Sequence, residues 1–293
     1  MSPVPPRALL DERESQAGPR VALTIAGTDS GGGAGIAADL RTFAAHGVFG
    51  TLVVTAVTAQ DTLGVHAIVP VGVPGVTAQL DAVLGDLRPR ASKTGMLASP
   101  GIVELVAERA SAGDLPLLVV DPVLVASSGD PLFVGTDVAT AYRRLVENAT
   151  VVTPNLPEAA LLTGSEVADL DAMHDAARAI HGFGAGLVIV KGGHRRDEES
   201  IDVAYDGRAF TLLRAPWVET GNVHGTGCTF SAAIAARLLL GASPLEAALG
   251  AKRYVTRAIA GAVRWRLGAG HGPIDQLGAS RLLGAPQIED GAP

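Results

Sequence analysis

The sequence predicts an α/β fold in which helices cover both faces of a mostly parallel central sheet, with a small β cover. Short, continuous apolar runs alternate along the chain with longer helical patterns, which is typical of parallel strands buried on both faces. The 36 glycines show no collagen-like period and gather in short loops, as tight strand–helix turns require. Hydrophobic residues make up 47% of the chain and aromatic residues only 4%, so we expect a core of Ala, Val, Leu and Ile.

The first third of the chain supplies the start of the predicted sheet and the predicted cover. A glycine-rich loop at residues 27–35 follows the first apolar run and opens a helix with Ile36, Leu40 and Phe43 on one face. We expect a small strand-built cover near residues 58–71. The predicted elements are strands at Val21–Ala26, Thr51–Thr58 and His66–Val71 and a helix from about Pro74 to Leu87.

The rest of the chain repeats the strand–helix alternation and then adds a hairpin and two helices. Asp206-Gly207 is a strong hairpin signal between Ile201–Tyr205 and Arg208–Leu213. A long Ala-rich helix follows residues 225–228, and a further helix begins near Ser243-Pro244, where Ser243 is a good N-cap. The buried strands predicted between these parts are Ala91–Met96, Leu117–Asp121, Ala149–Thr153 and Leu187–Lys191.

Domain organisation and the class of partner follow from composition. Residues 1–19 are rich in Pro, Arg and Glu and predict a mobile tail, and residues 20–293 predict a single domain without repeats or linkers. A net charge of −7 without a basic stripe argues against a nucleic-acid partner. The longest apolar helical run, 230–240, is too short to span a membrane. The single cysteine, Cys228, excludes an internal disulfide and fits the cytoplasm.

Polar groups are expected to converge at one edge of the sheet. In open parallel sheets, ligands bind at the carboxyl ends of the strands, and the informative residues of this chain follow predicted strands. Independent strands would therefore deliver these groups to one rim. They are the loop 27–35, Gln60, Lys93–Met96, Asp121, Asn155–Glu158, Lys191 and the loop 225–228.

The loop 225–228 predicts an anion site. Gly225, Thr226, Gly227 and Cys228 open a helix, where backbone N–H groups and the helix dipole favour negative charge. That field should lower the pKa of Cys228, so that a thiolate could accept the proton of an attacking hydroxyl. The alternative is an ordinary buried thiol beside a glycine turn, because free cysteine is commonly buried.

Two carboxylates at the same rim suit Mg²⁺, which favours oxygen ligands and retains water. Asp121 ends a predicted strand, and Glu158 lies at the start of a helix. Favourable charge at a helix N-terminus is the alternative role for Glu158. Lys191 could neutralise nucleotide phosphates, although a lysine at a strand end is more often simply solvated. The first glycine loop is not a Walker A motif, since no Gly-Lys-Ser/Thr follows it.

These motifs together carry a family resemblance that covers the chain from about Val21 to His271. The chain resembles the hydroxymethylpyrimidine/phosphomethylpyrimidine kinases of thiamine biosynthesis, within the ribokinase-like superfamily. Each motif alone is weak, but their order is specific. The matching segments are Leu23–Gly35, Thr58–Val65, Lys93–Leu97, Asp121–Val123, Thr153–Ala159, Lys191–His194 and His224–Cys228.

The resemblance implies two successive ATP-dependent phosphorylations, of 4-amino-5-hydroxymethyl-2-methylpyrimidine and then of its monophosphate, by a cytoplasmic homodimer. It implies that Asp121 and Glu158 handle Mg²⁺ and phosphates, that Lys191 and Asn155 meet ATP, and that the loop 225–228 forms an anion hole. The residues that it places around the pyrimidine are Ala34, Gln60, Met96 and Val123. The amide of Gln60 can both donate to and accept from a ring-nitrogen and amino edge.

Two departures from the family pattern and two rival functions accompany this expectation. Ala37 stands where the family usually has Gln, a change that is expected to matter little. Val223 stands where the family usually has Thr, and the loss of that hydroxyl is expected to weaken one nucleotide or phosphate contact. A pyridoxal kinase is the nearest rival, since its substrate is also a planar ring with a hydroxymethyl group. A non-catalytic metabolite-binding protein on the same fold is the rival from another class.

Overall fold

The computed structural model describes residues 18–124, 132–133, 138–193 and 199–279. Of the predicted mobile tail, residues 1–17 lie outside the described residues, as do the last fourteen residues of the predicted domain. Within the described part, eight strands form one sheet in the order β10-β9-β8-β7-β6-β5-β1-β2. They are β1 Val21–Ala26, β2 Phe49–Val54, β5 Ala91–Thr94, β6 Val119–Val120, β7 Val151–Val152, β8 Leu187–Lys191, β9 Glu199–Tyr205 and β10 Phe210–Pro216.

The sheet is mostly parallel, as predicted. Strands β2, β1, β5, β6, β7 and β8 pair in parallel, and β9 is antiparallel to both β8 and β10. The β9–β10 hairpin turns at Asp206 and Gly207, where Asp206 Oδ1 accepts the N–H groups of Arg208 and Ala209. Gly207 has a positive φ of 85°, which explains why the Asp-Gly pair predicted this turn.

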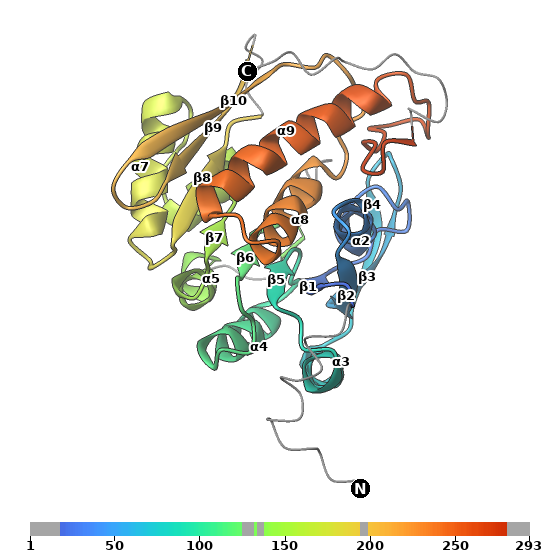
Figure 1. The fold of residues 1–293 in the computed structure, drawn as a ribbon, viewed down its shortest axis with the longest axis vertical. Helices are drawn as coiled ribbons and strands as arrows, with labels where there is room; N and C mark the ends of the chain where they lie inside the picture. The colour runs from blue at the N-terminus through green and yellow to red at the C-terminus, as the bar shows by residue number, and fades with distance from the viewer. Residues whose placement is uncertain (1–17, 125–131, 134–137, 194–198, 280–293) are drawn as a thin grey trace, which may run out of the picture.

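Helices cover both faces of the sheet (Figure 1). One layer packs against Leu23 and Ile25 of β1, and the other layer packs against Ala22, because side chains alternate along a strand. The first layer contains α3 Val73–Asp86, α4 Pro100–Ser111, α5 Val138–Glu147, α6 Leu156–Thr163 and α7 Leu170–His181. The second contains α2 Gly35–Ala45, α8 Thr226–Leu239 and α9 Pro244–Ala262.

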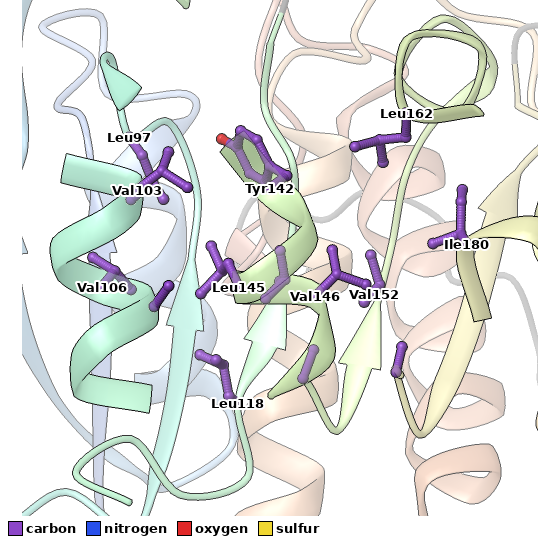
Figure 2. Close-up of a cluster of buried hydrophobic side chains, with 14 of the residues drawn as sticks. Leu97, Val103, Val106, Leu118, Tyr142, Leu145, Val146, Val152, Leu162 and Ile180 are labelled. Carbon is purple, nitrogen blue, oxygen red and sulfur yellow. The ribbon is translucent and has the colours of Figure 1, made fainter. Parts of the chain in front are cut away.

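Figure 2 shows the core of the first layer. Tyr142, Leu145 and Val146 project from α5 between the side chains of α4 and those of β7, and all three are fully buried. Continuous burial of branched aliphatic side chains on both faces of the strands is what the apolar runs in the sequence predicted.

The predicted strand Thr51–Thr58 is wrong as a single element. The chain leaves the main sheet at Thr55, and β3 (Ala56–Gln60) then pairs with β4 (Val65–Pro70) in a separate two-stranded sheet. Thr55 donates its N–H to Ala26 O and its hydroxyl to Met96 O, so both of its polar groups are satisfied in the bend. The small β cover is therefore confirmed. The β-branched run forms a strand in the main sheet and then a strand in the cover.

The central strands β5, β6 and β7 are shorter than predicted. The ladder ends at Thr94, Val120 and Val152, and the polar residues after them continue along the rim of the sheet. The predicted start of the last helix is confirmed, because Ser243 caps α9 in a capping box with Glu246. Across the residues described, none of the helices combines the length and apolarity needed to cross a bilayer.

Candidate active site

The ends of neighbouring parallel strands bring the predicted polar residues together. Asp121 follows β6, Thr153 follows β7 and Lys191 ends β8, and these strands lie side by side in register. Asp121 Oδ1 accepts from Lys191 Nζ at 2.9 Å and from Thr153 Oγ1 at 3.1 Å. The rim predicted from the sequence is therefore present, with Asp121 at its centre.

Asp121 is held as a carboxylate although its side chain is buried. Burial would raise its pKa, but the positive charges of Lys191 and Lys93 outweigh burial and lower it. Ser231 of α8 donates to the second oxygen, Asp121 Oδ2, at 3.1 Å. The lysine at the end of β8 is thus part of a buried ion pair and not a solvated side chain, since only 15% of its side chain is exposed.

Glu158 and Asn155 cap α6 reciprocally beside this carboxylate. Asn155 Oδ1 accepts the N–H of Glu158 at 2.9 Å, and Glu158 Oε2 accepts the N–H of Asn155 at 2.8 Å. Burial and the neighbouring charge of Asp121 raise the pKa of Glu158 to about 7, although Lys191 acts in the opposite direction. Glu158 therefore does have the role at the helix N-terminus that the sequence offered as an alternative. With this role, Glu158 still lies at the rim.

The donor set fits a magnesium ion that arrives with a nucleotide. Among the described residues, no group of three or more His, Cys, Asp and Glu side chains forms a dedicated metal cage. Mg²⁺ usually binds through one or two carboxylates together with substrate phosphates and water, so Asp121 and Glu158 are enough.

The loop 225–228 lies between the Asp121 cluster and the first glycine loop. Gly225 adopts the left-handed conformation with a φ of 82° and caps α8, and a Cβ there would lie 2.0 Å from Gly33 O. A Cβ on Gly227 would lie 3.4 Å from Lys191 Nζ, so the first turn of α8 approaches the lysine. The N-terminus of a long helix is thus directed at the strand rim, as an anion site requires.

Thr226 and Cys228 complete this loop. Thr226 Oγ1 donates to Val223 O at 2.6 Å, so the loop closes on the residue at which the chain departs from the family pattern. The predicted lowering of the Cys228 pKa is wrong. Burial of the thiol raises its pKa to about 11, because desolvation outweighs the nearby charge of Lys93 and the hydrogen bond from the Gly35 N–H.

The predicted pyrimidine residues lie around the first glycine loop and the β cover. Ala34 precedes α2, and its N–H donates to Asp29 Oδ2 at 2.8 Å. Gln60 ends β3, and its N–H donates to Ser30 Oγ of the same loop at 2.8 Å. Met96 and Val123 share a small apolar cluster with Val65 and Ile68 of β4, and a Cβ on Gly27 would lie 3.0 Å from the Met96 sulfur.

A hydrogen-bonded contact that no motif in the sequence predicts joins the two glycine loops. His224 Nε2 lies 2.8 Å from Asp29 Oδ2, and that oxygen also accepts the N–H of Gly33 at 2.9 Å. Hydrogen bonds from His224 and the backbone outweigh burial and lower the pKa of Asp29. The two residues stand 195 positions apart, so no local pattern predicts their contact.

A second missed pair is Lys93 with Asp39, both fully buried. Lys93 Nζ lies 2.9 Å from Asp39 Oδ2, which also accepts from Thr24 Oγ1 at 2.6 Å. A signal for this pair was available. Lys93 interrupts a predicted buried strand, and Asp39 stands three residues after Ile36 and four before Phe43, on the predicted apolar face of its helix.

Comparison with known proteins decides the family. The sequence model of the family described as phosphomethylpyrimidine kinase matches residues 29–275. The chain belongs to this kinase family. A hydroxymethylpyrimidine/phosphomethylpyrimidine kinase of Rhizobium meliloti is 48% identical over 255 residues, which cover 87% of this chain and 96% of the relative.

Solved structures show the same architecture. A phosphomethylpyrimidine kinase from Clostridium difficile superposes with a TM-score of 0.71 at 38% identity and covers 82% of this chain and 99% of its own. The pyridoxal kinase from Staphylococcus aureus, in complex with AMP-PCP and pyridoxal, gives a TM-score of 0.81 at 35% identity. That match covers 90% of this chain and 96% of the other. The fold is therefore shared by kinases named for two different ring substrates.

Proposed function

We propose that this member of the phosphomethylpyrimidine kinase family transfers the γ-phosphoryl group of ATP to 4-amino-5-hydroxymethyl-2-methylpyrimidine and then phosphorylates the monophosphate. One observation carries the proposal: the N-terminus of α8 meets Lys191 and Asp121 at the strand rim. The relative from Rhizobium meliloti, named for both phosphorylations, supports this choice of substrate.

The proposed roles follow from the geometry. Backbone N–H groups of Gly225, Thr226 and Gly227 face the charge that develops on the transferring phosphoryl group. Lys191 and Asn155 contact the phosphates of ATP, and the S. aureus pyridoxal kinase in complex with AMP-PCP supports a nucleotide as a ligand of this fold. Asp121 and Glu158 hold Mg²⁺, which neutralises phosphate charge when it is bound.

The thiol of Cys228 is the proposed base. As a thiolate it accepts the proton of the substrate hydroxymethyl group, whose oxygen forms the new bond to the γ-phosphorus while the bond to the ADP oxygen breaks. The proposed ring contacts are Ala34, Gln60, Met96 and Val123. Because Met96 and Val123 are apolar and Gln60 carries an amide, they suit a flat ring with one polar edge.

A mass-resolved product assay tests the substrate. We expect the pyrimidine alcohol, ATP and Mg²⁺ to yield first a monophosphate and then a diphosphate, with one ADP formed in each step. Pyridoxal is the matched alternative alcohol, and a higher kcat/KM for pyridoxal would refute the pyrimidine assignment. Binding of the pyrimidine without ADP release would instead favour the non-catalytic metabolite-binding protein.

We also propose that the enzyme is a cytoplasmic homodimer and that residues 20–293 act as one domain. The dimer is supported by apolar side chains left exposed on β2 and the β cover, where Phe49, Val57 and Val69 are each at least half exposed. Light scattering of the wild type and of Val69→Lys tests the assembly. A monomeric wild type, or a dimer unaffected by this substitution, would argue against that interface.

A further inference from the structure

One carboxylate joins the loop proposed to contact the pyrimidine to the loop proposed to face the phosphoryl group. Asp29 Oδ2 accepts the N–H groups of Gly33 and Ala34 at 2.9 Å and 2.8 Å. The same oxygen lies 2.8 Å from His224 Nε2, and because a carboxylate can only accept, His224 donates this third hydrogen bond. Ala34 is one of the proposed ring contacts, and His224 directly precedes Gly225 of the loop 225–228.

The backbone of the first glycine loop satisfies Asp29 without His224. Asp29 Oδ1 accepts the N–H of Gly31 at 2.9 Å, and Oδ2 accepts two further N–H groups of the same loop. Three such bonds satisfy a carboxylate whose side chain is 1% exposed. The contact with His224 is therefore not needed to shape the loop. Its effect is to tie the loop to a segment 195 positions away.

The two loops also touch through their backbones, so little space separates them. A Cβ on Gly225 would lie 2.0 Å from Gly33 O, and a Cβ on Gly33 would lie 2.5 Å from His224 Cδ2. Helices α2 and α8, which begin at the ends of these loops, pack against each other (Figure 1). A shift of the His224 ring would therefore move one loop relative to the other.

The segment that follows α9 fixes the backbone of His224. The His224 N–H donates to Gly272 O at 3.0 Å, and His224 forms an isolated parallel bridge with Pro273. Two residues earlier, Asn222 Nδ2 donates to the last carbonyl of α9 at 2.6 Å. His224 is thus a fixed point against which Asp29 can hold the first glycine loop.

We propose that Asp29 and His224 are positioning residues, whose hydrogen bond fixes the distance between the bound substrate alcohol and the N-terminus of α8. This catalytic role rests on the proposed function, in which the alcohol's ring contacts Ala34 and the phosphoryl group faces the loop 225–228. Neither side chain needs to touch a substrate. Displacing a reacting group by about 1 Å can lower a rate about 10²-fold, so a bond that spaces the two loops can control kcat.

Two substitutions of similar length at residue 224 test the hydrogen bond. His224→Gln can keep an N–H donor near Asp29, whereas His224→Met has no donor. We expect His224→Met to lower kcat about 10- to 100-fold, with both KM values within about threefold of the wild type, because each loop keeps its own ligand contacts. His224→Gln should recover kcat to within about fivefold of the wild type. Equal losses in the two variants, or a His224→Met enzyme with wild-type kcat, would overturn the proposal.

Hydrogen exchange measures the coupling of the loops without enzymatic turnover. Loss of one hydrogen bond should make the amides of the first glycine loop exchange about threefold to tenfold faster in His224→Met than in the wild type. Exchange in the β9–β10 hairpin should not change. Unchanged exchange in the first glycine loop would overturn the proposal. Equal acceleration in the loop and the hairpin would mean a loosened fold and would overturn it as well.

His46→Met is the matched control, because it makes the same substitution at a partly buried histidine of the same helical layer. His46 Nδ1 lies 2.8 Å from Thr42 O at the end of α2, and neither residue belongs to the proposed site. Both kcat and the exchange of the first glycine loop should keep their wild-type values in His46→Met. A fall in kcat equal to that of His224→Met would mean that the effect is not specific to the bond with Asp29.

A substitution in the opposite loop keeps the test decisive if His224→Met does not fold. Gly33→Ala leaves both positioning residues in place but displaces the His224 ring, since the new Cβ would meet Cδ2. It should lower kcat at nearly constant KM, as His224→Met does, and a fully active Gly33→Ala enzyme would overturn the proposal.

The two readouts separate this proposal from the proposed function. If the wild type phosphorylates neither alcohol, the proposed function fails and the catalytic role of the bond fails with it, while the exchange rates still decide whether the bond couples the loops. If the wild type is active and His224→Met is equally active, only the positioning role fails.

Discussion

The two helical layers of this protein are built from side chains of different size. The layer of α3 to α7 packs large side chains such as Tyr142, Leu145 and Leu162, whereas α8 buries Ala232, Ala233, Ala235 and Ala236 beside a few larger residues. Small side chains allow a helix to lie close to the sheet on one side and to α9 on the other (Figure 1). The helix that carries Cys228 therefore has little freedom to shift.

This difference in side-chain size indicates that the two layers have different roles. The large-residue layer buries bulky apolar side chains such as Tyr142 and Leu145, and the small-residue layer fixes the position of the α8 N-terminus. Glu158 is the exception, because it reaches the rim from α6 of the large-residue layer. Substitutions in the two layers should therefore separate effects on stability from effects on catalysis.

The largest expected effect is on catalysis and comes from the first turn of α8. Cys228→Ala should lower kcat by about 10²- to 10⁴-fold, equivalent to about 3–5 kcal/mol, because a general base acts in the transition state. The KM for the pyrimidine should change little. Steady-state kinetics would measure this, and a kcat near the wild-type value would show that the sulfur is not the base.

In the opposite layer, Leu145→Ala should cost about 2–5 kcal/mol of unfolding free energy, because it leaves a cavity in the fully buried core shown in Figure 2. The kcat of the folded fraction should stay close to that of the wild type. Urea unfolding followed by circular dichroism would measure the loss. Leu161→Ala is the control, since that leucine is 47% exposed on α6 and its loss should change the stability little.

Ala232→Leu tests the small-residue layer by adding volume instead of removing it. Ala232 is fully buried one turn after Cys228, so a larger side chain should cost about 1–3 kcal/mol and also lower kcat by displacing the first turn of α8. Ala82→Leu, at an exposed position of α3, should affect neither quantity. A stable and fully active Ala232→Leu enzyme would contradict the idea that α8 is fixed by close packing.

The sequence predicted the layers and the rim, but it could not predict the balance of forces at the site. Strand ends place Asp121 and Lys191 side by side because parallel strands share one edge, and this needs only the order of the elements. The pKa of Cys228 depends instead on burial, which competes with the helix dipole and is not encoded in the local loop. The Asp29–His224 contact could not be predicted either, because the two residues lie 195 positions apart in the sequence.

Glu158 makes the stability depend on pH. Its pKa is about 7 in the folded protein and 4.5 ordinarily, so between these values the folded state holds a proton that the unfolded state has released. The free energy of unfolding should therefore fall as the pH rises from 4.5 to 7, by about 1–3 kcal/mol in metal-free buffer.

Glu158→Gln should flatten this dependence, because glutamine can preserve the capping box but does not titrate. Chemical unfolding at a series of pH values would measure both slopes. Identical slopes in the wild type and the variant would exclude Glu158 as their origin.

The smallest effects come from the two capping boxes, one in each layer. Ser243→Ala and Asn155→Ala each remove the N-cap of a helix, α9 and α6, and should each cost about 1 kcal/mol of unfolding free energy. Only Asn155→Ala should also weaken ATP binding, because Asn155 lies at the rim and orients Glu158. Thermal unfolding and the KM for ATP would measure the two quantities. An equal change in KM in both variants would mean that helix stability, and not position at the rim, governs nucleotide binding.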